Sequence, residues 1–391
     1  MKNQDIIFFG SADWDNPYKT NQHYVAKYFS ENNRVLFVES LGLRQPVFQK
    51  KDIRRIFKRL VKGLKVVRRI NKNLIVFSPL VIPFHRYKLI NILNYIILRI
   101  FLEILIKRYN FNNPFIFSYI PNVLDFVKDI KYKFLVYHCV DEFSGNPLIP
   151  KNVVKKEKEL LQRADIVFVS SKTLFETKSK FAKKIFYLPN VANFEHFNSV
   201  LYKKVLIPED LKNIKKPIIG FHGAVSKYKL DFELINYIAE KLLDCSIVLI
   251  GPLGEGEKSV DLEKELKFKN IFYLGPKDYS ILPIYIKFFD VCILPNVINE
   301  YTKNMFPLKF FEYLALGKPV VVVDLPSLEE FKDVCYISKS YDEFVENVKK
   351  ALNESEKIKN KRIELAKNYS WNKRFKEIEQ ILENYENSID S

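Results

Sequence analysis

Residues 304–324 read N-M-F-P-L-K-F-F-E-Y-L-A-L-G-K-P-V-V-V-V-D and predict a short helix, a stop and a buried strand. Pro307 suits a first helical position, and Gly317 suits the left-handed residue after the last turn. Pro319 prevents further helix, and the β-branched run Val320–Val323 then favours a strand. The segment therefore predicts one helix-to-strand step of an α/β fold.

Two polar residues of this helix, Lys309 and Glu312, are three positions apart and therefore share a face. The amino end of a helix attracts phosphate, a lysine adds positive charge, and a carboxylate can accept both hydroxyl protons of a ribose diol. The pair predicts a site for a nucleoside diphosphate. An ordinary surface ion pair is the alternative.

Outside this segment, strand-like apolar runs alternate with helical patterns, which predicts parallel sheets joined by crossovers. The expected strands are 6–9, 35–38, 74–77, 115–119, 134–138 and 166–169 in the first half, and 217–221, 246–250, 271–274, 291–294 and 320–323 in the second. Regular periodicity lapses between residues 190 and 215. We therefore expect an α/β protein with two Rossmann-like domains, 1–195 and 196–370, followed by a helix over 371–391.

The composition is compatible with this organisation. A chain of 391 residues with 48% hydrophobic content can bury two cores. The amino terminus enters a strand without a secretory signal, and the four cysteines, Cys139, Cys245, Cys292 and Cys335, form no metal-binding spacing. We expect reduced thiols and a cytoplasmic location.

Ordered short motifs along the chain resemble those of GT-B glycosyltransferases, particularly retaining family 4 enzymes. The helix ends in the pattern E-x-x-A-x-G-x-P-V-V, and the opening I-I-F-F-G-S-A-D-W-D of residues 6–15 is similar to the first βαβ unit of teichuronic-acid-type envelope glycosyltransferases. The motifs V-Y-H-C-V-D-E-F-S, A-D-I-V-F-V-S-S, L-P-N-V-A-N-F-E-H-F and N-I-F-Y-L-G-P continue the likeness in order. The resemblance implies a GT-B fold with an interdomain cleft and a C-terminal helix that crosses back to the first domain.

The resemblance also implies that the second domain binds a nucleotide-diphosphate sugar, without a cofactor or a metal ion. Gly223 would let the backbone approach the diphosphate, Lys227 or Lys229 would neutralise it, and Asn304 or Glu300 would contact the sugar. The donor-binding residues expected from it are Gly223, Lys227, Gly275, Pro276, Asn304, Lys309 and Glu312. Gly275 and Pro276 would contact the base through their backbone, with simple turn chemistry as the alternative.

Residues that follow strands of the first domain are candidates for the catalytic and acceptor side, because ligands bind at the carboxyl ends of parallel strands. Asp13 could orient an acceptor hydroxyl or cap a turn. His138 could bind the transferred sugar or a phosphate, or be satisfied by its backbone neighbours. Asp141 follows the same strand, and Gln22 and His23 could line the acceptor cleft.

If the resemblance holds, the reaction is transfer of a sugar to a glycan or lipid-linked acceptor in cell-envelope polysaccharide synthesis, with retention at the anomeric carbon. Prearranged amides and lysines would stabilise the charge that grows on the leaving diphosphate. A sugar-nucleotide epimerase with the same architecture and a catalytically silent binding or scaffold protein are the alternatives.

The net charge of +17 is concentrated early in the chain. Residues 44–72 hold twelve Lys or Arg residues and one acid, with apolar residues at alternating gaps of four and three. This pattern predicts a basic amphipathic helix that lies on an anionic membrane surface, with a solvated domain helix as the alternative. No nucleic-acid-binding motif accompanies the charge, so we expect no nucleic-acid partner.

The apolar run 89–106 fails as a membrane span because Arg99 and Glu103 lie within it. Four residues apart, these two side chains can pair on the wet face of a domain helix. We therefore expect peripheral attachment to the inner face of the cell membrane.

Overall fold

The computed structural model describes residues 1–16, 19–40, 66–79, 88–143, 151–254 and 260–390. The chain divides into two compact units, one formed by Met1–Leu188 with Glu377–Ser391 and the other by Pro189–Lys376. The sequence placed the domain boundaries at 195/196 and 370/371. The observed divisions are seven residues earlier and six residues later.

The first unit contains an eight-stranded sheet in the order β3-β4-β2-β1-β5-β6-β7-β8. Its strands are β1 (Asp5–Phe9), β2 (Arg34–Val38), β3 (Val67–Arg69), β4 (Leu74–Phe77), β5 (Phe115–Ser118), β6 (Leu135–Cys139), β7 (Ile166–Val169) and β8 (Ile185–Tyr187). All neighbouring strands run parallel except β3, which is antiparallel to β4.

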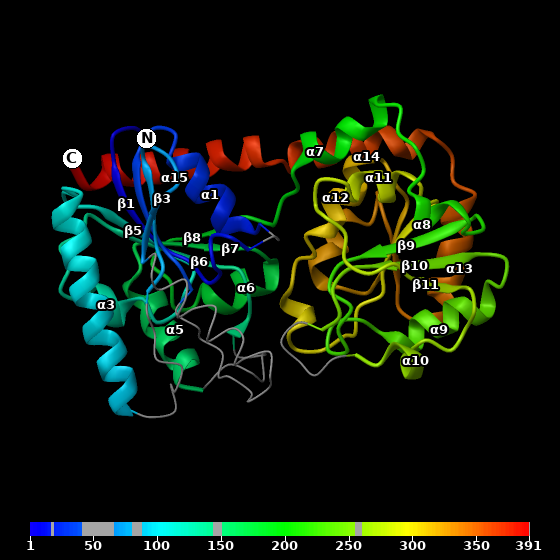
Figure 1. The fold of residues 1–391 in the computed structure, drawn as a ribbon, viewed down its shortest axis with the longest axis horizontal. Helices are drawn as coiled ribbons and strands as arrows, with labels where there is room; N and C mark the ends of the chain where they lie inside the picture. Colours follow the sequence, from blue (N-terminus) through cyan, green and yellow to red (C-terminus); the bar gives the residue numbers. More distant parts are fainter. Residues whose placement is uncertain (17–18, 41–65, 80–87, 144–150, 255–259, 391) are drawn as a thin grey trace. The chain divides into compact units, whose positions relative to one another are not determined.

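Helices cover both faces of this sheet (Figure 1). They are α1 (Asn21–Phe29), α3 (Lys88–Arg108), α4 (Leu124–Val127), α5 (Lys151–Arg163), α6 (Lys172–Lys178) and the last part of α15 (Trp371–Asp390). On one face Phe8 packs near Phe29 of α1, and Phe134 packs edge-on against Tyr385 of α15. On the other face the α3 residues Leu98 and Leu102 join the core.

The second unit contains a six-stranded sheet in the order β11-β10-β9-β12-β13-β14, with every pair parallel. Its strands are β9 (Ile218–His222), β10 (Ser246–Ile250), β11 (Ile271–Tyr273), β12 (Val291–Leu294), β13 (Val320–Val323) and β14 (Tyr336–Ser338). Its helices are α7 (Phe194–Asn198), α8 (Glu209–Lys212), α9 (Phe232–Lys241), α10 (Leu262–Glu265), α11 (Leu282–Lys287), α12 (Lys309–Ala315), α13 (Tyr341–Leu352), α14 (Lys357–Asn368) and the start of α15.

The predicted α/β class with two mainly parallel sheets is confirmed, and each predicted strand appears within a few residues of its expected position. Three short strands, β3, β8 and β14, were not predicted. Each is three residues long, and each ends its sheet, where partial exposure weakens the apolar pattern that marks a buried strand.

The basic helix predicted over 44–72 is wrong at its end, because Val67–Arg69 forms strand β3 against β4. Pairing with a neighbouring strand overrides the local helical pattern here. Residues 44–65 of that prediction lie outside the described residues.

Helix α12 begins at Lys309, two residues after Pro307, and Gly317 has the predicted left-handed backbone with φ +68°. The helix is only seven residues long. The electrostatic attraction of its amino end for phosphate is therefore smaller than the sequence argument assumed, because few peptide dipoles add up.

Helix α3 carries the predicted pair, since Arg99 Nε lies 3.0 Å from Glu103 Oε1. Arg99 also pairs with Asp129, at 2.7 Å. Among the described helices, none is long and apolar enough to cross a membrane.

Candidate functional site

The candidate site lies in the second unit, at the carboxyl ends of β9 and β12. Strand β9 lies between β10 and β12, so the chain leaves β9 and β12 for opposite sides of the sheet. Open α/β sheets bind ligands at such a switch point, because the loops diverge there and leave room.

Gly223 follows β9 directly and has φ +140°, a conformation that side chains rarely adopt. A Cβ placed on Gly223 would lie 1.9 Å from Lys309 Cε. The Lys309 side chain therefore lies directly over the Gly223 backbone. The structure brings together two residues that the sequence assigned separately to a diphosphate.

A cavity of about 100 Å³ opens beside this contact. Its walls come from the exits of β9 and β12 and from the start of α12, and include Phe221, Lys229, Asn296, Pro307 and Lys309. Two lysine side chains thus line one small cavity. Such a pair of ammonium groups suits a ligand with several negative charges, such as a diphosphate.

Glu312 is 8% exposed and lies against His222, the last residue of β9. His222 Nε2 lies 3.0 Å from Glu312 Oε2. Burial lowers the pKa of His222 and Lys309 lowers it further, which together outweigh the raising effect of Glu312. A neutral His222 therefore lies against the Glu312 carboxylate without adding a positive charge to it.

The loop after β11 reaches the same carboxylate. Tyr279 Oη lies 3.5 Å from Glu312 Oε1, and the Tyr279 ring stacks on His196 at 4.9 Å. Gly275 opens this loop with φ +71°, and its carbonyl accepts a hydrogen bond from Gly251 N–H at 3.0 Å. Pro276 is exposed. The loop predicted to contact a base therefore ends beside the residue predicted to bind the ribose.

Two other predicted donor contacts lie elsewhere. Lys227 Nζ forms an ion pair with Glu265, and its side chain is 55% exposed. Lys229, which the sequence left as the alternative, lines the cavity with Lys309. Asn304 Nδ2 donates to the Glu300 carbonyl at 2.6 Å, and neither residue lines the cavity.

His138 of the first unit lies inside the protein, with 0% exposure. Its Nδ1 is 3.2 Å from Tyr119 Oη, and Phe117 and Phe168 pack around its ring. Protein side chains therefore enclose this imidazole. The contact at Nδ1 comes from a tyrosine side chain and not from the backbone neighbours of the alternative.

Asp13 and Asp141 lie at strand exits of the first unit and are partly exposed. His23 Nε2 lies 3.0 Å from the Asp13 carbonyl oxygen, and the Gln22 side chain accepts from Ser11 N–H at 2.6 Å. Gln22 and His23, both nearly buried, therefore hold the loop after β1 in place. The structure gives them a supporting position behind that loop.

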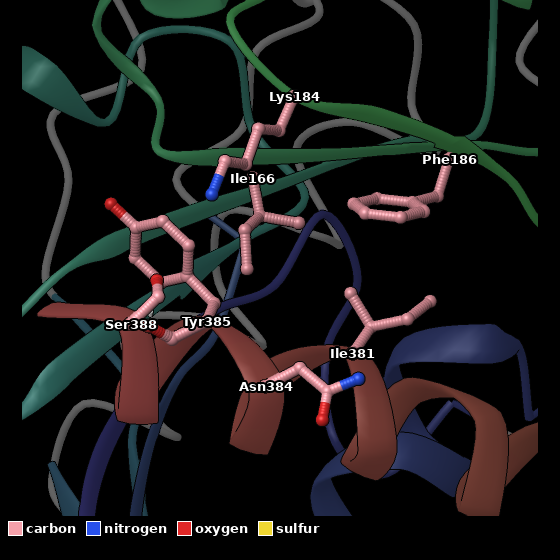
Figure 2. Close-up of a pocket in the computed structure, with 7 residues that line it drawn as sticks. All are labelled: Ile166, Lys184, Phe186, Ile381, Asn384, Tyr385 and Ser388. Carbon is pink, nitrogen blue, oxygen red and sulfur yellow. Dashed lines mark hydrogen bonds between the residues drawn. The ribbon is translucent and has the colours of Figure 1, made fainter.

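A larger cavity, of about 160 Å³, lies in the first unit between β7, β8 and the last turns of α15 (Figure 2). Ile166 and Lys184 place it at the amino ends of these strands, and the Lys184 ammonium lies 4.6 Å from the centre of the Tyr385 ring. Ligands of open α/β sheets bind at the opposite ends of the strands. We therefore do not assign the donor to this cavity.

Part of the second unit is similar in sequence to a known protein family. Residues 216–354, which contain the candidate site, match the family model described as "Glycosyl transferases group 1". The predicted resemblance to group 1 glycosyltransferases is confirmed. TuaH of Bacillus subtilis (strain 168), named for a glycosyltransferase role in teichuronic acid biosynthesis, is 30% identical over 239 residues, which cover 58% of this chain and 59% of that protein.

Solved structures extend the likeness over nearly the whole chain. Sucrose-phosphate synthase from Thermosynechococcus elongatus has a TM-score of 0.69 at 12% identity and covers 98% of this chain and 99% of its own. The chain has the GT-B fold. HepE of Anabaena, solved in complex with UDP, has a TM-score of 0.67 at 15% identity and covers 97% of this chain and all of its own. At these identities the GT-B neighbours establish the fold alone.

Sequence reasoning missed two residues of this site, His222 and Asn296. Both follow or end a buried strand, in the stretches G-F-H-G and L-P-N. The criterion that singled out Asp13 and His138 in the first unit would also have found them.

Proposed function

We propose that this protein is a glycosyltransferase that moves a sugar from a nucleotide-diphosphate sugar to a glycan or lipid-linked acceptor in cell-envelope polysaccharide synthesis. The observation that carries the proposal is the close approach of Lys309 to Gly223 at the switch point of the second sheet. The match of residues 216–354 to group 1 glycosyltransferases and the name of the Bacillus relative support it.

In the proposed mechanism, the diphosphate lies where Gly223 exposes its backbone, and Lys309 and Lys229 neutralise it. Negative charge on the diphosphate grows as the glycosidic bond breaks. Ammonium groups fixed in position stabilise that charge more in the transition state than in the bound donor, which lowers the barrier. Transfer would proceed with retention and without a metal ion.

The nucleoside would lie toward the loop after β11, with its ribose hydroxyls on Glu312. A neutral His222 lies beside this carboxylate on one side, and the Tyr279 hydroxyl donates to it on the other. The UDP bound in the HepE structure supports a nucleotide donor of this class. On the acceptor side, Asp13 and Asp141 remain the proposed contacts.

The donor assignment can be tested by measuring the affinity of the wild type for UDP, GDP, dTDP and CMP by calorimetry. We expect selective binding of one nucleoside diphosphate and a loss of tenfold or more, roughly, in Glu312→Ala, because the ribose loses both hydrogen bonds. Glu329→Ala, which removes an exposed carboxylate of the same unit, is the control. Unchanged affinity in Glu312→Ala would reject the ribose assignment.

Turnover then separates the reaction from its alternatives. A transferase consumes the donor much faster when an acceptor is supplied. An epimerase converts the donor without an acceptor, and a silent protein binds it without turnover. The acceptor panel should include both free glycans and polyprenyl-linked glycans, since these are the proposed acceptor classes.

A further part of the proposal is attachment to an anionic membrane surface. Residues 44–65 lie outside the described residues, so the structural support comes from α3. This helix exposes an apolar stripe at helical spacing: Leu89, Ile92, Leu93, Ile96, Ile100 and Ile104 are all 44% exposed or more. Lys107 and Arg108 are exposed at its carboxyl end.

Apolar side chains on one face and cations beside them suit a helix that lies in the headgroup region of an anionic bilayer. The opposite face of α3 is fixed to the core by Leu98, Leu102 and Leu105, so the stripe is held outward. We expect the wild type to sediment with vesicles that contain phosphatidylglycerol and to be released by salt.

The double variant Ile96→Glu/Ile100→Glu should lose this sedimentation, whereas Leu206→Glu, at an exposed leucine of the second unit, should keep it. Equal recovery of the double variant and the wild type would contradict the proposal. The proposal would also be contradicted if the wild type formed a dimer that the double substitution dissociated, and if the wild type did not sediment with vesicles.

A further inference from the structure

The cavity beside Gly223 and Lys309, proposed above to bind the donor, contains a polar group without an assigned role, the side-chain amide of Asn296. This residue follows β12 by two positions, lines the cavity with Lys229 and Lys309, and is 7% exposed. Its backbone surroundings are well fixed, because Asp231 N–H donates to the Pro295 carbonyl at 2.9 Å.

The orientation of the amide follows from its one hydrogen bond. Asn296 Nδ2 donates to the Lys229 carbonyl at 3.1 Å. A flipped amide would place two carbonyl oxygens against each other, so Nδ2 must face Lys229. The Oδ1 atom is buried, and no donor in the described part of the chain reaches it.

A buried acceptor without a partner is costly, and native proteins keep few such groups. The charge of the cavity limits what can satisfy it. Phosphate oxygens are themselves acceptors and would be repelled by Oδ1, whereas a neutral hydroxyl can donate to it. The two lysines suit the phosphates, and Oδ1 suits a hydroxyl next to them.

We propose that Asn296 Oδ1 accepts a hydrogen bond from a hydroxyl of the transferred sugar. This inference rests on the proposed donor site and names the group that holds its sugar. It replaces Asn304, whose Nδ2 is bound to the Glu300 carbonyl outside the cavity walls. Asn296 is then a specificity residue, since a sugar without that hydroxyl leaves Oδ1 unsatisfied.

The test compares the dissociation constants of a nucleoside diphosphate and its hexose conjugate, starting with UDP and UDP-glucose. In Asn296→Ala, the ratio of the conjugate's constant to that of the diphosphate should rise about tenfold, because only the conjugate carries the hydroxyl. Asn299→Ala is the matched control. Its Nδ2 donates to the adjacent Tyr228 carbonyl at 2.7 Å, but its Oδ1 already accepts from Tyr301 N–H and Thr302 N–H.

A structural role alone would change both ligands alike and would make Asn296→Ala resemble Asn299→Ala, which would overturn the inference. Monodeoxy hexose conjugates give a second measurement on the wild type. One monodeoxy conjugate should bind the wild type more weakly than the parent hexose conjugate, by the same factor. The Asn296→Ala variant should bind these two conjugates with equal affinity. If the wild type binds no nucleoside diphosphate, the proposed function fails first; if it binds both ligands and the ratio is unchanged, only the Asn296 assignment fails.

Discussion

The two sheets of this protein end in different ways, although both are open and mainly parallel. In the second unit the strand exits carry Gly223, Gly251 and Gly275, all with positive φ, and the Lys309 side chain comes down onto exposed backbone. In the first unit His138, near the end of β6, is packed among aromatic rings, and Glu142 after β6 belongs to a buried ion cluster. One edge carries glycine backbone and a lysine beside a cavity, and the β6 end of the other buries its polar groups.

That difference explains why similar sequence motifs after strands do not indicate a ligand site equally well. A glycine with positive φ has no side chain, so the space next to its backbone amide stays open. A polar residue after a strand is ambiguous, because it can turn toward solvent or toward the core. Glu142, three residues after β6, shows the second outcome: its carboxylate lies 2.9 Å from the Lys178 ammonium, which also lies 2.9 Å from Glu157, and all three side chains are buried.

The largest expected effect concerns this buried cluster. Burial works against the Lys178 ammonium, but Cys139, Glu157 and Glu142 hold its pKa above the usual value. Lys178→Met leaves two buried carboxylates without their cation and should lower the free energy of unfolding of the first unit by about 3–5 kcal/mol. Urea denaturation measures the loss, while nucleotide binding by the second unit should persist.

Lys156→Met is the control for that prediction. Lys156 pairs with Asp125 at the surface, so its loss should change the free energy of unfolding by about 1 kcal/mol or less. Equal destabilisation by the two variants would show that the buried cluster has no special role.

The next effect compares two glycines of the second unit. Gly223→Ala requires a strained φ of +140° and displaces Lys309, whose Cε lies 1.9 Å from the new methyl position. We expect a cost of about 1–3 kcal/mol in stability, together with weakened nucleotide binding. Differential scanning fluorimetry with and without nucleotide measures both.

Gly275→Ala separates the two causes. Its φ of +71° also disfavours alanine, but among the described residues nothing lies within 4 Å of the added methyl. Its stability cost should be about 1–2 kcal/mol, and its nucleotide affinity should fall less than that of Gly223→Ala, because the backbone groups proposed to contact the base remain. Equal loss of affinity in both variants would contradict a specific contact of Gly223 with the ligand.

The smallest effect is a pH dependence caused by His222. Because the folded state lowers the pKa of His222, the unfolded state binds more protons once the pH falls below about 6.5. The wild type should therefore lose stability as the pH is lowered through this range, and the loss should be smaller than that caused by Gly223→Ala. His222→Gln should lose correspondingly less between about pH 7.5 and about pH 5.5 in thermal unfolding, since glutamine does not titrate. Parallel curves for the two proteins would contradict a neutral, buried His222.

Much of this fold could be predicted from the sequence, because buried strands and helix ends are each marked by the residue types of a short stretch of sequence. The run Val320–Val323 and the left-handed Gly317 appear as expected. The site could be predicted only in part. Helical spacing singled out Lys309 and Glu312 as candidates, whereas which of Lys227 and Lys229 lines the cavity depends on how one turn folds.

The sequence also does not indicate clearly whether a polar side chain at the end of a strand is enclosed by other side chains. His138 and His222 both end or nearly end an apolar strand, yet the first is enclosed by rings and the second lies against a carboxylate. Which outcome occurs depends on side chains contributed by distant segments, such as Tyr119 for one and Glu312 for the other. Local periodicity carries no information about these partners.

The most direct test of the account is the affinity of the second unit's site for a diphosphate, measured by calorimetry on the full chain with UDP and UMP. Lys309→Ala should weaken the diphosphate by tenfold or more, roughly, and the monophosphate less, because one phosphate charge loses its ammonium partner. Lys227→Ala should stay within about threefold of the wild type, since its ammonium is already paired at the surface. A larger loss in Lys227→Ala than in Lys309→Ala, or no loss in either, would contradict the assignment of the diphosphate to Gly223 and Lys309.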